Sequence, residues 1–184
     1  MPWTLDTQHA EVGFSAKHMM VATVKGRFTD VEAEIHLDEQ QPEASRVKAV
    51  VQAASLTTGN ADRDAHLKSA DFLDVERFPV LTFESAAVRR TGPDTFELGG
   101  DLTIRDVTRP VVLSGEFTGP VKSPWGDRRS GFSLTGAIDR EAFGLTWNVA
   151  MEAGGVLVSK TVKLAIDAEL VEQAEEQPAA ANVA

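Results

Sequence analysis

The 184-residue sequence contains no cysteine and no tyrosine. Without cysteine, the chain can form neither disulfide bonds nor thiolate metal sites. No stretch approaches the run of about 20 apolar residues that spans a bilayer, so we expect no stable membrane insertion. The N-terminal residues Met-Pro-Trp-Thr-Leu-Asp lack a basic run followed by an apolar core, so no signal peptide is visible. These features predict a cytoplasmic protein.

Positive charge is scarce, with 18 lysine and arginine residues against 28 aspartate and glutamate residues, a net charge of −10. A chain with this charge repels phosphate backbones, which argues against a nucleic-acid partner. The same charge disfavours docking on anionic membrane surfaces. The length suits one domain, which we expect over residues 1–171, followed by a polar, alanine-rich and disordered tail over 172–184.

Recognisable catalytic and cofactor motifs are also missing. The chain has no G-x-S-x-G, no P-loop, no G-x-G-x-x-G and no H-E-x-x-H. The four histidines, His9, His18, His36 and His66, lack paired metal-ligand spacing, so we expect neither a metal nor a cofactor. Two alternatives stay open: a metal-binding stress protein, and an enzyme for a small lipophilic substrate that uses His66 with Asp62, four residues away on a predicted helix.

Apolar and polar residues alternate with a period of two along most of the chain, the pattern of half-buried strands. The alternating segments are 12–18, 24–28, 31–37, 47–53, 81–85, 96–104, 111–117, 132–138 and 162–170. We interpret them as about eight antiparallel strands that close into one extended, all-β, lipocalin-like barrel, with a sandwich as the alternative. A phase slip near Thr29 predicts a bulge or bend. The apolar face carries Gly26, Gly100, Gly115 and Gly136, which mark either barrel corners or room for a ligand.

One segment departs from the alternation and predicts a short helix over about residues 60–71. Asn60 is a suitable N-cap, and Asp62 and Asp64 would lie near the positive end of the helix dipole. Pro79 then restricts helical geometry at Phe78 and allows a strand to begin. A single helix in a β-rich chain is expected to plug or flank the barrel.

Several sequence motifs occur in order and together resemble the YceI-like family of bacterial lipid-binding proteins. They are W-T-L-D-T-Q-H-A-E-V-G-F-S-A-K-H from Trp3, V-K-G-R-F from Val24, S-L-T-T-G-N-A-D-R-D-A-H-L-K-S-A-D-F-L-D from Ser55, G-D-L-T-I-R-D-V-T-R-P-V-V-L from Gly100 and I-D-R-E-A-F-G-L-T-W-N from Ile138. The resemblance covers roughly residues 3–171. It implies a lipocalin-like barrel whose lumen holds a polyisoprenoid, a quinone tail or another long-chain lipid, and a possible homodimer.

We therefore predict a non-enzymatic protein that stores or transports a long isoprenoid-type lipid inside the barrel. The predicted lumen residues are apolar and come from most strands: Val12, Phe14, Phe28, Leu81, Phe83, Leu102, Phe132 and Leu164. Leu67 and Phe72 are expected to cover one end, and Trp147 is expected to contact the ligand. His18 and Arg63 are the candidates for contact with a polar head group.

Overall fold

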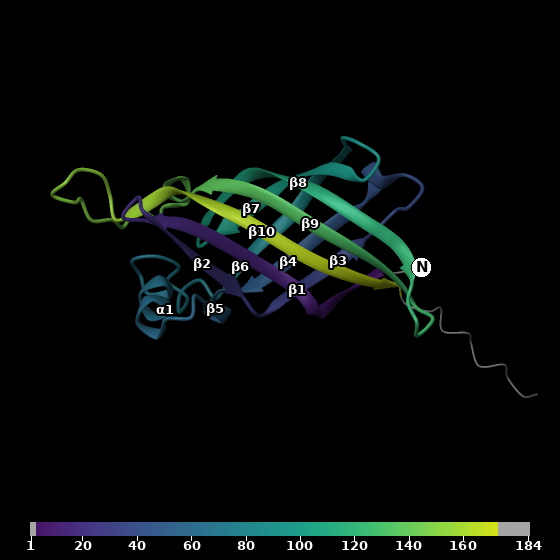
Figure 1. Cartoon of the computed structure of the whole chain (residues 1–184), viewed down its shortest axis with the longest axis horizontal. Helices are drawn as coiled ribbons and strands as arrows, with labels where there is room; N and C mark the ends of the chain where they lie inside the picture. The colour runs from purple at the N-terminus through teal and green to yellow at the C-terminus, as the bar shows by residue number, and fades with distance from the viewer. Residues whose placement is uncertain (1–2, 173–184) are drawn as a thin grey trace, which may run out of the picture.

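The computed structural model describes residues 3–172 and contains one antiparallel sheet of ten strands (Figure 1). The strands are β1 (Trp3–His18), β2 (Ala22–Phe28), β3 (Val31–His36), β4 (Arg46–Gln52), β5 (Leu56–Thr57), β6 (Val80–Arg90), β7 (Thr95–Ile104), β8 (Val107–Lys122), β9 (Arg128–Asp139) and β10 (Val158–Glu172). Their order across the sheet is β3-β4-β6-β7-β8-β9-β10-β1-β2-β5. Most strands that are neighbours in the sheet are also consecutive in sequence. The first and last strands, β1 and β10, pair with each other inside the sheet.

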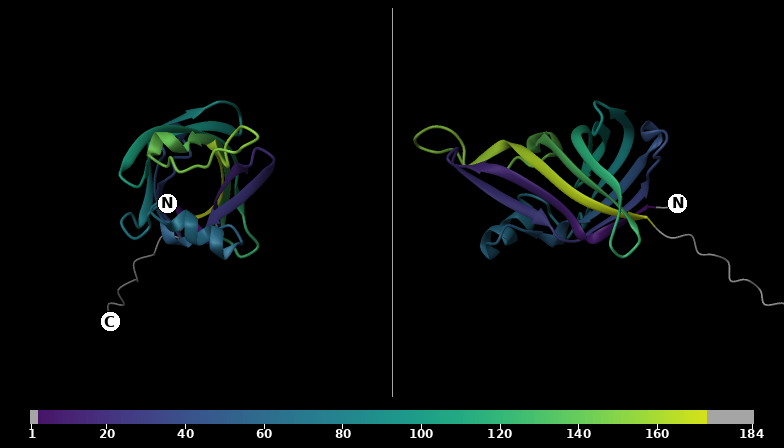
Figure 2. Two further views of the ribbon diagram at one scale, coloured as in Figure 1. Left: turned by 90° about the vertical axis from the view of Figure 1, so that its left-hand side faces the viewer. Right: turned by 45° about the vertical axis from the view of Figure 1, so that its right-hand side comes forward.

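The sheet curls until its strands surround a central axis, as the end-on view in Figure 2 shows. The prediction of an all-β, antiparallel, lipocalin-like fold is confirmed, and one continuous sheet replaces the alternative of a sandwich. The pairing is open, however, because β3 and β5 form the two edges of the sheet. Over residues 3–172 the curl is completed by packing of β3 beside β1.

The predicted bend near Thr29 is present and partly explains why the strands number ten instead of the expected eight. The hydroxyl of Ser55 accepts hydrogen bonds from the backbone N–H groups of Thr29 and Asp30, at 3.1 and 3.2 Å. These groups therefore leave the ladder, so that β2 ends at Phe28 and β3 begins at Val31. The two-residue strand β5, which pairs with β2, adds to the count.

The predicted helix is shorter than expected, since α1 covers Ala61–Lys68 instead of about 60–71. Asn60 caps it as predicted, because its side chain accepts a hydrogen bond from the N–H of Arg63 at 3.0 Å. The helix ends early because Ser69 turns back, with both its N–H and its hydroxyl bonded to the carbonyl of His66. After Pro79, β6 begins at Val80. Short 3-10 helices cover Pro42–Ala44, Ala53–Ser55 and Arg140–Phe143.

Buried apolar side chains form two clusters along the axis of the curled sheet. The first lies toward α1 and includes Phe28, Leu56 and Phe143; the second is built from Leu98, Leu113 and Leu134. In the described part of the chain, no helix is long and apolar enough to cross a membrane. Of the predicted tail, Glu172 still belongs to β10, whereas residues 173–184 lie outside the described residues.

Candidate functional site

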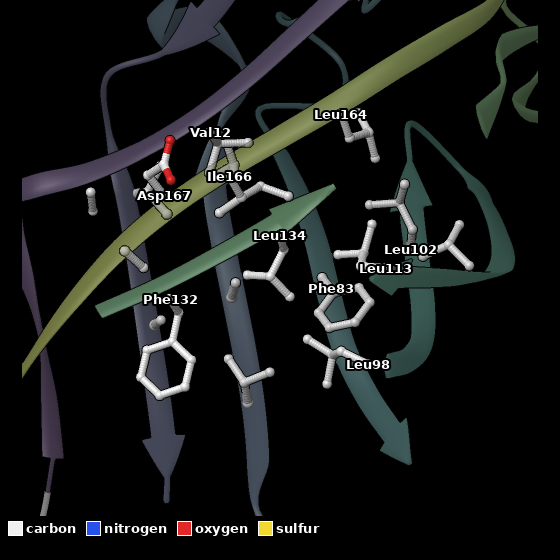
Figure 3. A pocket seen from close by; sticks show the side chains of 18 of the residues that line it. Val12, Phe83, Leu98, Leu102, Leu113, Phe132, Leu134, Leu164, Ile166 and Asp167 are labelled. Atoms are coloured by element: carbon white, nitrogen blue, oxygen red, sulfur yellow. The ribbon is translucent and has the colours of Figure 1, made fainter. Parts of the chain in front are cut away.

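An elongated cavity of about 630 Å³ lies inside the curled sheet. Figure 3 shows apolar side chains from several strands converging on it, among them Val12, Phe83, Leu102, Leu134 and Ile166. The cavity follows from the alternation of the strands, which directs every second side chain inward. The result is a long apolar tunnel with few polar groups in its wall, which suits an apolar guest.

Most of the predicted ligand-contact residues lie in the wall of this cavity. Those in the wall are Val12, Phe14, Phe28, Leu67, Phe72, Leu81, Phe83, Leu102, Phe132 and Leu164. His18, Arg63 and Trp147 are not in the wall. His18 is exposed at the end of β1, and Arg63 donates to the hydroxyl and the carbonyl of Thr58. Contact of any of these residues with a ligand stays a prediction.

The inward glycines have a specific role in keeping the cavity open. Gly26 lies directly opposite Phe14, and Gly115 directly opposite Phe96, on paired strands. A Cβ added at either glycine would come within 2.3 Å of the facing phenylalanine ring. Each ring therefore lies flat across the bare backbone of the neighbouring strand. The rings line the wall instead of filling the tunnel.

The other two inward glycines show how general this arrangement is. A Cβ on Gly100 would lie 2.5 Å from the ring of Phe83, so this glycine also accommodates an aromatic side chain. A Cβ on Gly136 would instead meet a methyl group of Leu113 at 2.6 Å. Of the two interpretations offered by the sequence, room inside the barrel is closer to what is observed. The room is made indirectly, because the glycine accommodates a ring of the protein itself.

Sequence reasoning missed Arg140, which borders the cavity and is only 2% exposed. Its guanidinium donates to the backbone carbonyls of Leu145, Trp147, Val158 and Ser159. Burial lowers the pKa of Arg140 from its ordinary value. No carboxylate bonds to it within residues 3–172. The sequence contained a signal for this position. Arg140 is the next residue in the period-two series of inward residues Phe132, Leu134, Gly136 and Ile138.

The aromatic residues beside Arg140 cover this end of the cavity. The His66 ring packs edge-on against Trp147 and Phe72, with ring centroids 4.5 and 5.1 Å apart. Of these, Phe72 reaches the cavity wall. The predicted pairing of His66 with Asp62 is wrong, because His66 Nε2 bonds to Asp71 at 2.9 Å. The early end of α1 brings Asp71 back toward His66, so this histidine is part of an aromatic cover.

One group of side chains in residues 3–172 has the composition of a metal site. Asp6, His9 and Glu169 have their potential ligand atoms within 4.8 Å of one another. Arg129, however, already pairs with both Asp6 and Glu169. The hydrogen bond between His9 and Asp6 raises the pKa of His9 and lowers that of Asp6. The carboxylates therefore have a cation partner from the protein itself, and the cluster is an ion-pair network on the outside of the sheet.

Comparisons with known proteins agree with this fold. A model of the YceI-like domain matches residues 3–170. A relative from Ectopseudomonas mendocina named UPF0312 protein is 38% identical over 166 residues, covering 90% of this chain and 84% of the relative. The crystal structure of a Campylobacter jejuni YceI protein superposes with a TM-score of 0.75 at 32% identity, covering 93% and 98% of the two chains. A polyisoprenoid binding domain from Saccharophagus degradans shares the fold, with a TM-score of 0.65, 12% identity and coverage of 94% and 99%.

Proposed function

This chain belongs to the YceI-like family, and on that premise we propose that its cavity binds a long apolar lipid, specifically a polyisoprenoid or the tail of an isoprenoid quinone. The observation that carries the proposal is the apolar cavity of about 630 Å³ whose wall includes residues of both core clusters. The name of the Saccharophagus degradans neighbour, a polyisoprenoid binding domain, supports the same class of ligand. The protein stores or transports this lipid without changing it chemically.

The size of the tunnel sets the scale of the ligand. If each heavy atom takes about 30 Å³, as a water molecule does in the liquid, the 630 Å³ tunnel holds on the order of 20 atoms, or about four isoprene units. Removing each methylene from water contributes about 0.8 kcal/mol, so the gross gain is on the order of 16 kcal/mol. Loss of free motion on binding offsets about 4–15 kcal/mol of this. Tunnel length and width therefore govern which lipid binds.

The surroundings of His66 favour binding over catalysis. In the alternative enzyme, His66 and Asp62 would act together on a substrate in the cavity. His66 instead bonds to Asp71, packs between two aromatic rings and does not reach the cavity wall. An acid–base group must come within hydrogen-bond reach of its substrate, and this geometry gives that alternative no support.

The test is a change in the width of the tunnel. Phe83 lines the wall, where its ring already lies against Gly100, so the larger indole of a Phe83→Trp variant must extend into the tunnel. We expect the folded variant to lose most of the lipid that native mass spectrometry and organic extraction recover from the wild type. Val112→Trp is the matched control, because Val112 is 60% exposed. Equal lipid content in Phe83→Trp and wild type would show that the ligand does not occupy this tunnel.

A further inference from the structure

Exposed apolar side chains gather at one end of the molecule, on two loops that touch. The first loop is the turn between β1 and β2, where Met19, Met20 and Val21 are 47%, 59% and 83% exposed. The second is the loop that precedes β10, with exposed Val149 and Val156. We call these five side chains the apolar tip. Both loops lie at the left end of the molecule in Figure 1, where the loop before β10 projects beyond the sheet.

The apolar tip is a built structure. The N–H of Met19 bonds to the carbonyl of Leu157 at 2.8 Å, which joins the two loops. The second loop forms a small hairpin, with a bridge between Ala150 and Val156 and a bond from the N–H of Leu157 to the carbonyl of Val149. At its base, the side chain of Asn148 bonds to both backbone groups of Val158. The apolar groups are therefore presented together on one support.

The backbone of the turn shows that these methionines are poorly suited to their positions on conformational grounds. Met19 and Met20 have φ values of 53° and 60°, the left-handed region that disfavours side chains other than those of glycine and asparagine. Turns with positive φ at both central residues strongly prefer Asn-Gly. Asn and Gly would therefore stabilise this turn more than two methionines do. The stability of the turn does not explain why exposed methionines stand here.

The two segments that form the apolar tip and its adjoining strands carry a net charge opposite to that of the whole molecule, although three acids outside them, Glu11, Asp139 and Glu141, pair with two of their cations. Segments 12–29 and 142–166, which form the tip and the strands that lead to it, contain five basic residues, Lys17, Lys25, Arg27, Lys160 and Lys163, and one acidic residue, Glu152. Their net charge is +4, whereas the whole chain carries −10, so the remaining residues carry −14. The global charge, which by itself disfavours anionic membranes, therefore hides a local basic region.

Three of these cations have no carboxylate partner within residues 3–172 and can meet an external anion, although Nζ of Lys17 also donates to the hydroxyl of Thr23. Arg27 pairs with Glu11, and Lys160 pairs with Asp139 and Glu141. Within residues 3–172, Lys17, Lys25 and Lys163 form no ion pair. Lys25 and Lys163 lie on either side of Ser15 across three adjacent strands. Phe14 and Leu164 line the cavity, so the alternation places Ser15, Lys25 and Lys163 on the outer face.

The apolar tip also adjoins one end of the lipid cavity. Trp147 stands at the start of the second loop, next to Asn148, and packs on Phe72, which lines the cavity. Val158, held by Asn148 at the base of the same loop, lines the cavity as well. A surface that touched the tip would therefore lie close to the end of the tunnel that is covered by His66, Phe72 and Trp147.

We infer that the apolar tip and its three free lysines dock the protein on an anionic phospholipid bilayer, with the covered end of the tunnel facing the membrane. Apolar side chains enter the interface while lysines attract anionic head groups, as in other peripheral proteins. The contact is transient and peripheral. This inference rests on the proposed function, because docking would place the tunnel next to a source of long apolar lipids.

The test is flotation of the full-length protein with vesicles of phosphatidylcholine and phosphatidylglycerol, compared with vesicles of phosphatidylcholine alone. The tip variant carries Met19→Asn, Met20→Gly and Val21→Ser, with Val112→Ser as the control for an exposed valine elsewhere. The charge variants are Lys25→Gln and Lys163→Gln, with Lys122→Gln as the control at the other end of the molecule.

We expect the wild type to float with the anionic vesicles at low salt and to dissociate as salt rises. The substitutions of Lys25 and Lys163, which lie on the strands that lead to the tip, should each weaken binding about fivefold. The tip variant should not float, although its Tm should equal or exceed that of the wild type, since Asn-Gly suits the turn. The two controls should float like the wild type.

Three outcomes would overturn the inference: a wild type that does not float, a tip variant that floats equally well, or self-association through the tip without flotation. Lipid extraction separates this inference from the proposed function. A protein that yields lipid but does not float refutes docking alone. A protein that floats but holds no lipid refutes the proposed cavity ligand alone.

Discussion

The glycine at position 115 offers the most direct test of how the cavity is kept open. In a Gly115→Ala variant, the new methyl group would lie 2.3 Å from one carbon of the Phe96 ring and 2.6 and 2.7 Å from two others. Ordinary contacts between carbon atoms are about 3.5–4.0 Å, so the edge of the ring must move by more than about 1 Å. The three nearest heavy atoms all belong to this ring, which can swing away from the wall, and the free space is the tunnel.

The expected effect on stability and on capacity can be estimated from this overlap. Forcing an extra methyl group into a packed wall costs about 1–3 kcal/mol. At about 2–4 °C per kcal/mol for a chain of this length, a cost near 2 kcal/mol lowers the Tm by roughly 4–8 °C. Because protein interiors are close-packed, a ring turned into the tunnel excludes about its own volume of ligand, roughly one isoprene unit. The variant should fold and retain a shorter lipid.

Native mass spectrometry and thermal unfolding measure the two effects, and Gly99→Ala is the matched control. A Cβ at Gly99 has its nearest neighbour at 3.9 Å, so this variant should keep the ligand and gain about 0.4–1 kcal/mol in stability. Adding Phe96→Leu to Gly115→Ala should remove the clash, which a double-mutant cycle detects as coupling between the two sites. A Gly115→Ala variant with unchanged ligand length and unchanged Tm would refute the role assigned to the glycine.

Two further predictions concern polar side chains. Arg140→Met should lower the stability by about 3 kcal/mol, because the carbonyls of Leu145, Trp147 and Ser159 lose the guanidinium donor, whereas that of Val158 keeps its bond from Asn148; calorimetry against Arg140→Lys measures the loss. Partial burial raises the pKa of Asp64, but hydrogen bonds from Thr58 outweigh it and hold the pKa below its ordinary 3.8. Its stabilisation is therefore present above pH 3.8 and lost as the pH falls through the folded-state pKa, so the Tm advantage of wild type over Asp64→Asn should shrink in acid.

Much of the fold could be predicted from the sequence because the period-two pattern directly encodes which side chains point inward. The same pattern would have identified Phe96, Leu98 and Leu113 as wall residues, since they share the inward positions of their strands. The phase slip predicted the bend at Thr29 but not that it divides one strand into two, because that break depends on a hydroxyl from Ser55, 26 residues away. A local pattern contains no information about such a partner.

The candidate site was harder to predict than the fold, for a similar reason. His66 and Asp62 have helical spacing, yet the turn after Lys68 brings Asp71 to the imidazole first. The inward glycines were visible, but their effect depends on which residue stands opposite each one. The register of the paired strands determines which residue stands opposite each glycine, as it does for Phe14 and Gly26. Charge was misleading when summed over the chain, because the basic region arises where β2, β1 and β10 lie side by side.

The glycine–aromatic pairs also make the direction of lipid entry testable, because they occupy different parts of the tunnel. Phe14, opposite Gly26, packs with the core cluster toward α1, whereas Phe96, opposite Gly115, packs with the other cluster. If lipid enters at the end next to the apolar tip, a ring displaced in Gly26→Ala blocks the path near its start, and a ring displaced in Gly115→Ala only shortens it. We therefore expect mass spectrometry to find Gly26→Ala nearly empty and Gly115→Ala filled with a shorter chain. The reverse result would place the entrance at the opposite end, away from Met20 and Trp147.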